Sequence, residues 1–130
     1  MDYITEDGRN LFDEWYRNED QRVQAEFDAT LSILSALGDW RGHWQYEDLH
    51  EEHRGLGEIR FSIKADRFLS KWKYRVAGFA TLNYRQFILV VGCKKSRMLG
   101  GYHPKGAFDT ALDLKRRFEE GIGSTYERLI

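Results

Sequence analysis

Apolar side chains recur at helical spacing in the first third of the chain. Residues 9–18 contain a short helical stripe, and residues 19–37 continue it at steps of three and four residues, which is typical of one face of an amphipathic helix. The stripes consist of Leu11, Phe12, Trp15 and Tyr16, then Val23, Phe27, Leu31, Leu34 and Leu37. Gly38 follows directly, which predicts a left-handed residue at the end of the second helix.

The spacing of apolar residues then changes to strict alternation. Ile59, Phe61 and Ile63 alternate with polar residues, which predicts a half-buried strand over residues 58–64. Residues 87–91 form an unbroken apolar run, which predicts a central strand covered on both faces. The other expected elements are a short edge strand at Tyr3–Ile4, a connection over 39–56, a strand over 72–82, a turn at Asn83–Tyr84, a basic loop over 94–106 and a helix over 107–122 ended by Gly121 or Gly123.

This order of elements predicts a single α+β domain over residues 1–130. We expect a small antiparallel β-sheet, with two N-terminal helices and a C-terminal helix packed on one side of it. The helical, acidic part should span residues 1–53. The sheet, the basic loop and the last helix should span residues 54–130.

The charge of the chain divides at the same place. Residues 1–53 hold 14 acidic and 4 basic residues, whereas residues 54–130 hold 7 acidic and 16 basic ones. The two parts therefore carry −10 and +9, although the whole chain carries only −1. A strongly basic part indicates a surface that meets a polyanion, with nucleic acid as the first candidate.

Cysteine content and hydropathy indicate the compartment. Cys93 is the single cysteine, which excludes an internal disulfide and is typical of a reducing cytosol. The acidic start is unlike a secretory signal, and no stretch approaches the ~20 apolar residues of a membrane span. We therefore expect a cytoplasmic protein with no membrane partner.

The strand pattern predicts where basic side chains gather. Because the apolar residues of 58–64 should face the helices, their polar neighbours should point to the opposite face, which the next strand and the basic loop extend. Side chains expected there are Glu58, Arg60, Ser62, Lys64, Lys73, Arg75, Lys94, Lys95, Arg97, Tyr102, His103 and Lys105. The predicted RNA-binding residues among them are Lys64, Lys73, Lys94, Arg97 and Lys105. A solvated basic surface without a ligand is the alternative.

Such a face has the groups that RNA cleavage without a metal needs. A ribose 2′-OH attacks the adjacent phosphate, so one group must accept its proton and another must protonate the 5′-oxygen. Positioned proton transfer contributes ~10²–10⁴-fold, and cations placed at the phosphate stabilise the extra charge of the phosphorane. Arginine suits this role because its guanidinium is planar and always charged.

The sequence predicts no metal and no cofactor. Glu47 and His50 have the i, i+3 spacing of carboxylate metal bundles, but those sites need a second such motif, which the sequence lacks. We expect a solvated acidic turn there. Cys93 ends an apolar strand, which favours a buried structural thiol over a nucleophile. Trp72 lies between two lysines, and core packing and base stacking are its two alternatives.

Four motifs span nearly the whole chain. They are the opening Tyr3–Trp15, the segments Leu56-Gly-Glu-Ile-Arg-Phe61 and Lys73-Tyr-Arg-Val76, and the run Phe87-Ile-Leu-Val-Val-Gly-Cys-Lys-Lys95. In this order they resemble phage-derived RelE/HigB-type toxins of type II toxin–antitoxin systems, and the final helix also fits. Glu58 stands where ribosome-dependent members carry a basic residue. A glutamate there acts either as a general base or as a group that repels phosphate.

The resemblance implies a RelE-like fold and an endoribonuclease that cleaves mRNA without a metal, usually in association with the ribosome. The catalytic residues that it implies are Arg60, Arg75, Lys95, Tyr102 and His103. Arg60 and Arg75 correspond to the arginines at the scissile phosphate, and Tyr102 or His103 to the group that transfers a proton or stacks on a base. The implied partners are a cognate antitoxin protein and mRNA, with the ribosome as a further candidate.

Two other kinds of function stay open at this point. The ParE branch of the same superfamily shares the fold and poisons DNA gyrase, so the chain could be a gyrase poison or a degenerate toxin kept for its antitoxin. A phage accessory protein that binds nucleic acid without cleaving it is the third alternative.

Overall fold

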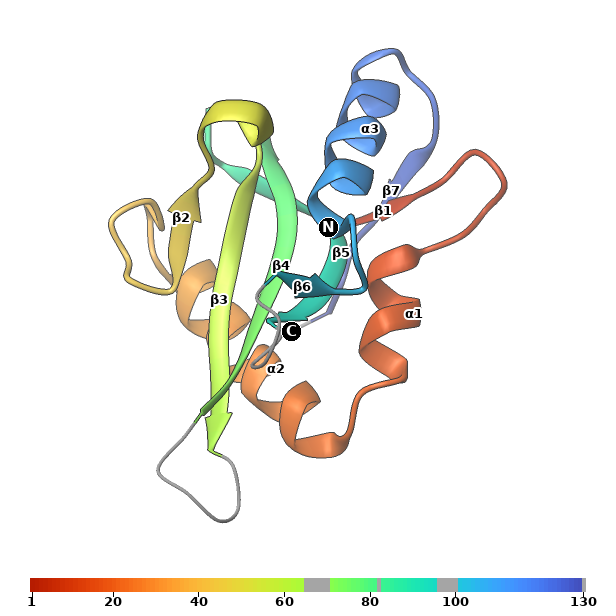
Figure 1. Ribbon diagram of the computed structural model, residues 1–130. Coiled ribbons are helices and arrows are strands. Elements are labelled where there is room, and N and C mark those ends of the chain that lie inside the picture. The colour runs from red at the N-terminus through yellow and green to blue at the C-terminus, as the bar shows by residue number, and fades with distance from the viewer. Residues whose placement is uncertain (65–70, 82, 96–100, 130) are drawn as a thin grey trace.

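The centre of the protein is an open, mixed β-sheet of seven strands (Figure 1). The computed structural model describes residues 1–64, 71–81, 83–95 and 101–129. The strand order is β2-β3-β4-β5-β1-β7, with β6 paired to β5 as well. The strands are β1 (Asp2–Ile4), β2 (Tyr46–Asp48), β3 (Gly57–Lys64), β4 (Lys71–Thr81), β5 (Gln86–Lys95), β6 (Tyr102–His103) and β7 (Ser124–Tyr126). Three α-helices complete the fold, and the α+β class is confirmed.

The prediction of a purely antiparallel sheet with an edge strand at Tyr3–Ile4 is wrong. Strand β1 runs parallel to β5, with Asp2 opposite Leu89, and it lies inside the sheet because β7 pairs on its other side. The Met1 ammonium donates to the carbonyl of Phe87 at 2.9 Å and fixes this register. Strands of three residues are too short to show an alternating pattern, so the sequence did not predict β7.

Helices α1 (Leu11–Arg17) and α2 (Gln21–Ala36) pack on one face of the sheet, α1 against β5 and α2 against β3. Side chains before each helix accept hydrogen bonds from its first turn: Asn10 from Asp13 N, and Asp20 from Val23 N. The predicted left-handed residue at Gly38 is wrong, because α2 ends on Leu37 in an extended conformation. The chain leaves the helix there without needing a positive φ.

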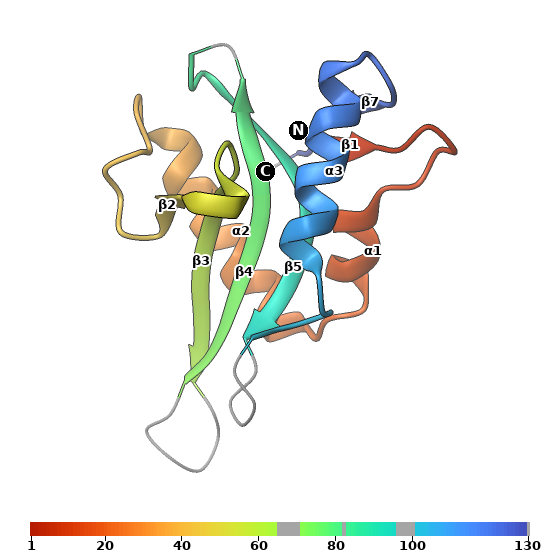
Figure 2. The ribbon, with the colours of Figure 1, turned by 45° about the horizontal axis from the view of Figure 1, so that its top comes forward.

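Helix α3 (Ala107–Glu119) covers the opposite face of the sheet, so the prediction that all helices lie on one side is wrong. Figure 2 shows α3 in front of β4 and β5, with α2 behind the sheet. The physical reason lies in β5, whose residues Ile88 to Val91 are all buried and therefore need cover on both faces. Gly121 follows α3 with φ 81°, as predicted for a helix end.

Regular structure also occurs in segments expected to be loops. The connection over 39–56 contains β2 and a 3₁₀ turn, η1 (Glu51–His53), and the loop over 94–106 contains β6. Asn83 and Tyr84 have φ values of 56° and 65° and form the expected turn. Within the described ranges, no helix is long and apolar enough to cross a membrane.

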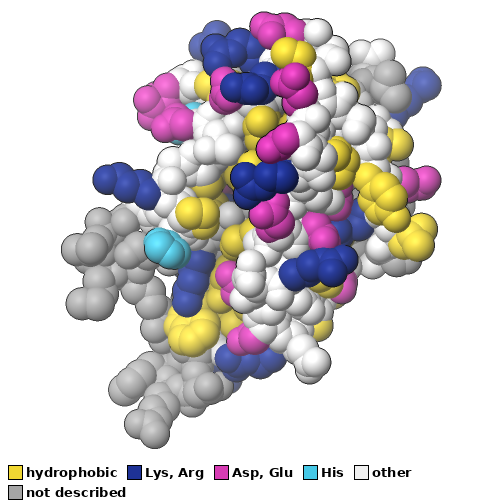
Figure 3. Space-filling view, turned by 90° about the vertical axis from the view of Figure 1, so that its right-hand side faces the viewer, with side chains coloured by type: hydrophobic (Ala, Val, Ile, Leu, Met, Phe, Trp, Pro, Cys, Tyr) yellow, Lys and Arg dark blue, Asp and Glu magenta, His cyan; other side chains and the backbone are white. Residues whose placement is uncertain are grey.

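The surface around α3 carries both signs of charge. Figure 3 shows acidic and basic side chains interspersed over this side of the molecule. On α3 itself, Asp113 pairs with Arg116 and Arg117, and Lys115 pairs with Glu119. Exposed pairs of this kind contribute little to stability. Because both signs are present, the surface of α3 is neither strongly positive nor strongly negative.

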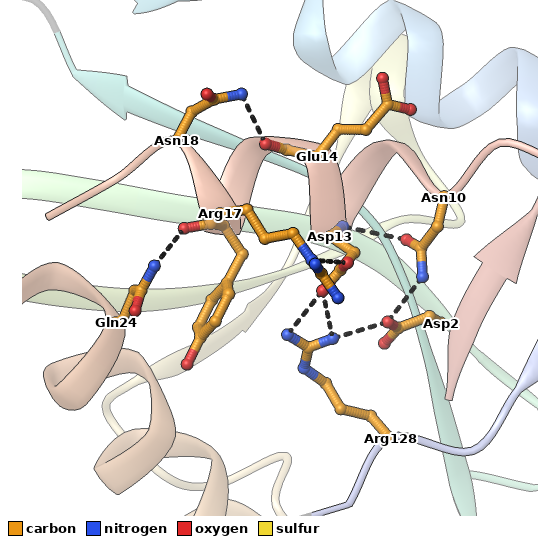
Figure 4. A network of polar contacts seen from close by, with 9 residues as sticks. Asp2, Asn10, Asp13, Glu14, Arg17, Asn18, Gln24 and Arg128 are labelled. Carbon is orange, nitrogen blue, oxygen red and sulfur yellow. Dashed lines mark hydrogen bonds and ion pairs between the residues drawn. The ribbon is translucent and has the colours of Figure 1, made fainter. Parts of the chain in front are cut away.

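A buried ionic network fastens the end of the chain to its beginning (Figure 4). Arg128 donates to Asp2 at 2.7 Å and to Asp13 at 3.2 Å, and Asn10 donates to the same Asp2 oxygen at 2.8 Å. The Arg128 guanidinium also lies 4.8 Å from the centre of the Phe12 ring. Because Asp2 is fully buried, losing Arg128 would leave its charge poorly compensated. The network therefore holds β1, α1 and the C-terminal segment together.

Gly92 permits the close approach of α1 to β5. A Cβ atom at this position would lie 2.1 Å from Cε3 of Trp15, which is far inside van der Waals contact. We predict that Gly92→Ala lowers the free energy of unfolding by about 1–3 kcal/mol, because the Trp15 ring must move out of a packed site. Urea denaturation of the variant and the parent measures the difference.

Gly38→Ala is the matched control for this substitution. Its new Cβ meets nothing within 4 Å and its φ is not positive, so stability should stay equal or rise by roughly 0.4–1 kcal/mol. Equal losses in both variants would show that the contact with Trp15 is not the cause.

Candidate functional site

Two arginines lie directly opposite each other on neighbouring strands. In the register of β3 and β4, Arg60 pairs with Arg75. Both point away from α1 and α2, because their neighbours Phe61 and Val76 belong to the core on that side. The alternation predicted from the sequence is therefore confirmed. Like charges directly opposite each other destabilise a sheet unless an anion lies between them.

Glu58 supplies that anion. Its side chain is only 4% exposed, and its Oε1 lies 2.9 Å from Nε of Arg60 and 3.6 Å from Nε of Arg75. Arg75 is itself only 13% exposed, whereas Arg60 is 37% exposed and can meet solvent or a ligand. The guanidinium of Arg75 also donates from Nη1 to the carbonyl of Tyr74 at 2.9 Å. Arg75 and Glu58 thus form a buried ion pair, and the more exposed Arg60 packs against it through its contact with Glu58.

A second carboxylate reaches Arg60 from the edge of the sheet. Glu47 of β2 lies opposite Glu58 in the strand register and forms an ion pair with the Arg60 guanidinium. Glu47 is 44% exposed, so a ligand anion can displace it. Sequence reasoning placed Glu47 in an acidic turn and missed this contact. The signal was the alternation of Tyr46, Glu47 and Asp48, which is too short to stand out.

Tyr102 and Lys95 complete the polar group. They pair between β6 and β5, and the Tyr102 ring packs edge-on against Phe108 of α3, with ring centres 4.8 Å apart. Lys95 is exposed and its charge acts on Glu58. We call Glu47, Glu58, Arg60, Arg75, Lys95 and Tyr102 the Glu58 group.

Burial shifts the acid–base properties of this group. It raises the pKa of Glu58 above its ordinary value of 4.5, and Arg75 and Lys95 oppose the rise. It also raises the pKa of Tyr102, with Glu58 acting in the same direction and Arg75 against it. Burial and then Arg75 lower the pKa of Arg60, but an arginine stays charged at neutral pH. The group therefore combines a carboxyl whose pKa is shifted towards neutrality with an accessible guanidinium.

Other residues predicted for the site lie elsewhere. Lys94 points to the α1/α2 side, where its Nζ lies 4.0 Å from the centre of the Trp72 ring. His103 pairs with Lys94 in the sheet and is exposed, so the structure does not bring it to Glu58. Lys64 and Lys73 are exposed further along the face that carries Arg60.

Two predicted residues belong to the basic loop. Lys105 is exposed before α3, and Arg97 lies outside the described residues.

The surroundings of Cys93 and of the acidic turn indicate structural rather than catalytic roles. Cys93 is fully buried opposite Arg75, and burial raises its pKa to about 12, so it is a poor nucleophile. In the acidic turn, His53 Nε2 lies 2.9 Å from a carboxylate oxygen of Asp109. No group of three or more His, Cys, Asp or Glu side chains is arranged to hold a metal within the described ranges.

No family model, no curated protein and no solved structure matches this chain. The Glu58 group can bind a phosphate through Arg60 and Lys95, and its carboxyl, whose pKa burial raises, is a stronger proton acceptor than an exposed glutamate.

The raised pKa of Glu58 predicts a pH-dependent contribution to stability. Because the pKa of Glu58 is higher in the folded protein than in the unfolded chain, the unfolded chain loses this proton at lower pH. Ionisation of Glu58 therefore favours the unfolded state. The contribution of Glu58 is therefore highest below pH 4.5 and falls as pH rises through its folded-state pKa. Glu58→Gln keeps the shape of the side chain but cannot ionise.

We expect the stability of Glu58→Gln relative to the parent to increase with pH. Urea unfolding of both proteins at several pH values between about 4 and 8 measures this trend. The reverse trend would show that Arg60 and Arg75 stabilise the carboxylate more than burial disfavours it.

Proposed function

We propose that this chain is a RelE/HigB-type toxin that cleaves mRNA by attack of a ribose 2′-OH on the adjacent phosphate. The single observation that carries the proposal is the buried carboxylate of Glu58 set between Arg60 and Arg75 on one sheet face. The antiparallel pairing of β3, β4 and β5 and the basic end of β5 also support a RelE-like arrangement. A cognate antitoxin that covers this face belongs to the same proposal.

Each member of the Glu58 group takes a role set by its exposure. Arg60 and Lys95 are accessible and bind the scissile phosphate, where their charge stabilises the phosphorane. Arg75 is mostly buried and positions Glu58 and Arg60. Glu58 accepts the proton of the 2′-OH, because burial raises its pKa towards the working pH. Tyr102 is a hydroxyl donor beside them and protonates the leaving 5′-oxygen.

The accessible guanidinium gives the sharpest test. We predict that Arg60→Gln lowers mRNA cleavage by about 10²–10³-fold, since removing one charge-stabilising donor has effects of this size. Primer extension on mRNA after induction in cells measures cleavage, and growth arrest should be lost in parallel. Arg60 is partly exposed, so the variant should fold.

Arg54→Gln is the matched control, because Arg54 is an exposed cation outside the Glu58 group. It should cleave like the parent. Intact mRNA with broken DNA in the parent would indicate gyrase poisoning instead. Intact mRNA and DNA, with steeply salt-dependent nucleic-acid binding, would indicate an accessory binding protein.

The ion pair between Glu47 and Arg60 predicts a gain of affinity. Glu47 competes with a phosphate for the same guanidinium, and an exposed pair is worth about 0.5–1 kcal/mol. Glu47→Gln should therefore tighten binding of single-stranded RNA by about twofold to fivefold. Fluorescence anisotropy with a labelled oligonucleotide measures the dissociation constant.

Glu52→Gln removes an equal charge from an exposed position of η1. This control shows whether a gain in RNA affinity comes from freeing the Arg60 guanidinium or only from the loss of one negative charge. If both variants gain the same affinity, the contact between Glu47 and Arg60 does not compete with RNA.

A further inference from the structure

A pocket of about 470 Å³ lies on the α1/α2 side of the sheet, away from the Glu58 group. It is enclosed by the end of α2, the turn between β4 and β5, the start of β5 and the C-terminal segment. Ile59 and Leu89 of the sheet line its floor. Pockets of this size, mostly apolar with a few polar groups at the mouth, are the usual sites of small ligands.

Aromatic rings line this pocket. The Trp40 ring lies with its centre 6.4 Å from each of the rings of Tyr46, Tyr84 and Phe87. Tyr46 and Phe87 are 5.7 Å apart and nearly perpendicular. All four side chains belong to the pocket lining. Rings in edge and tilted contact offer a flat ligand both apolar area and favourable ring geometry.

An energetically disfavoured turn brings one of these rings to the pocket. Asn83 and Tyr84 both have positive φ values, 56° and 65°, and this conformation is unfavourable for a residue other than glycine. The turn sets Tyr84 against Trp40 and places Arg85 beside it in the lining. The Arg41 guanidinium also lies 4.5 Å from the centre of the Tyr84 ring.

One cation in the pocket lining is available to a ligand. Arg85 is exposed, and it has no hydrogen bond or ion pair within the described part of the chain. Arg128 also lines the pocket, but its guanidinium is engaged by Asp2 and Asp13. The Met1 ammonium donates to Phe87, and burial lowers its pKa. The lining also contains the exposed carboxylate of Glu127, whose charge acts on the Met1 ammonium. The unengaged charge in the lining that suits an anion is that of Arg85.

We propose that this pocket binds a flat aromatic anion, with the ligand ring against Trp40, Tyr84 and Phe87 and its anionic group at Arg85. The apolar floor and ring walls favour the aromatic body, and the unpaired guanidinium favours a carboxylate, sulfonate or phosphate. This site is separate from the Glu58 group and does not depend on RNA cleavage.

The aromatic sulfonate 1-anilinonaphthalene-8-sulfonate is the probe for this site. Titration of the full chain should show saturable fluorescence enhancement with one site per chain. Arg85→Gln should weaken binding by about tenfold, since it removes a hydrogen bond to a charged group. Ser35→Trp places a large ring in the pocket lining and should abolish binding.

Two matched controls separate the pocket from other surfaces. Ser32→Trp adds the same ring on α2 at an exposed residue outside the lining, and Arg54→Gln removes an exposed cation that lines a different hollow. Both should bind the probe like the parent, and near-UV circular dichroism checks that each variant is folded. Absence of saturable binding, more than one site per chain, or equal effects of Arg85→Gln and Arg54→Gln would overturn the proposal.

Discussion

The buried carboxylate of Glu58 is the constraint on which the polar face of the sheet depends. The register of β3 and β4 sets Arg60 directly opposite Arg75, and only an anion between them makes that pairing favourable. Burial in turn penalises the charge of Glu58, as its raised pKa indicates. The three side chains therefore stabilise one another in one geometry, and removing one leaves a buried charge poorly compensated.

Helix α3 shields one side of the Glu58 group from solvent. By packing on the β4–β5 side that the other helices leave uncovered, it brings Phe108 against Tyr102 and closes one wall of the Glu58 group. On the other face, α2 covers β3 and α1 packs on β5, and the aromatic pocket lies between the end of α2, the β4–β5 turn and the C-terminal segment. The Glu58 group and the aromatic pocket thus lie on opposite faces of one sheet, which the three helices divide between them.

The sequence predicted the strands that position Arg60 and Arg75 because these strands have eight and eleven residues, long enough to contain a segment of clear alternation. It did not predict the mixed sheet, since β1 and β7 have three residues each. An amphipathic helix pattern also does not indicate which face of a sheet the helix covers, so α3 was misplaced. The sequence analysis places Lys94 and Lys95 on the same face, but side chains alternate along a strand, and the two lie on opposite faces.

The acidic first part and the basic second part of the chain neutralise each other in places in the folded protein. Acidic residues of the first part neutralise basic residues of the second, as Glu47 does for Arg60, and Asp2 and Asp13 do for Arg128. A polyanion that approaches the β3–β4 face therefore meets exposed lysines such as Lys73 first, and their attraction is screened by salt. At Arg60 it competes with Glu47 for the guanidinium. The acidic part thus weakens the attraction of the basic face for an anion.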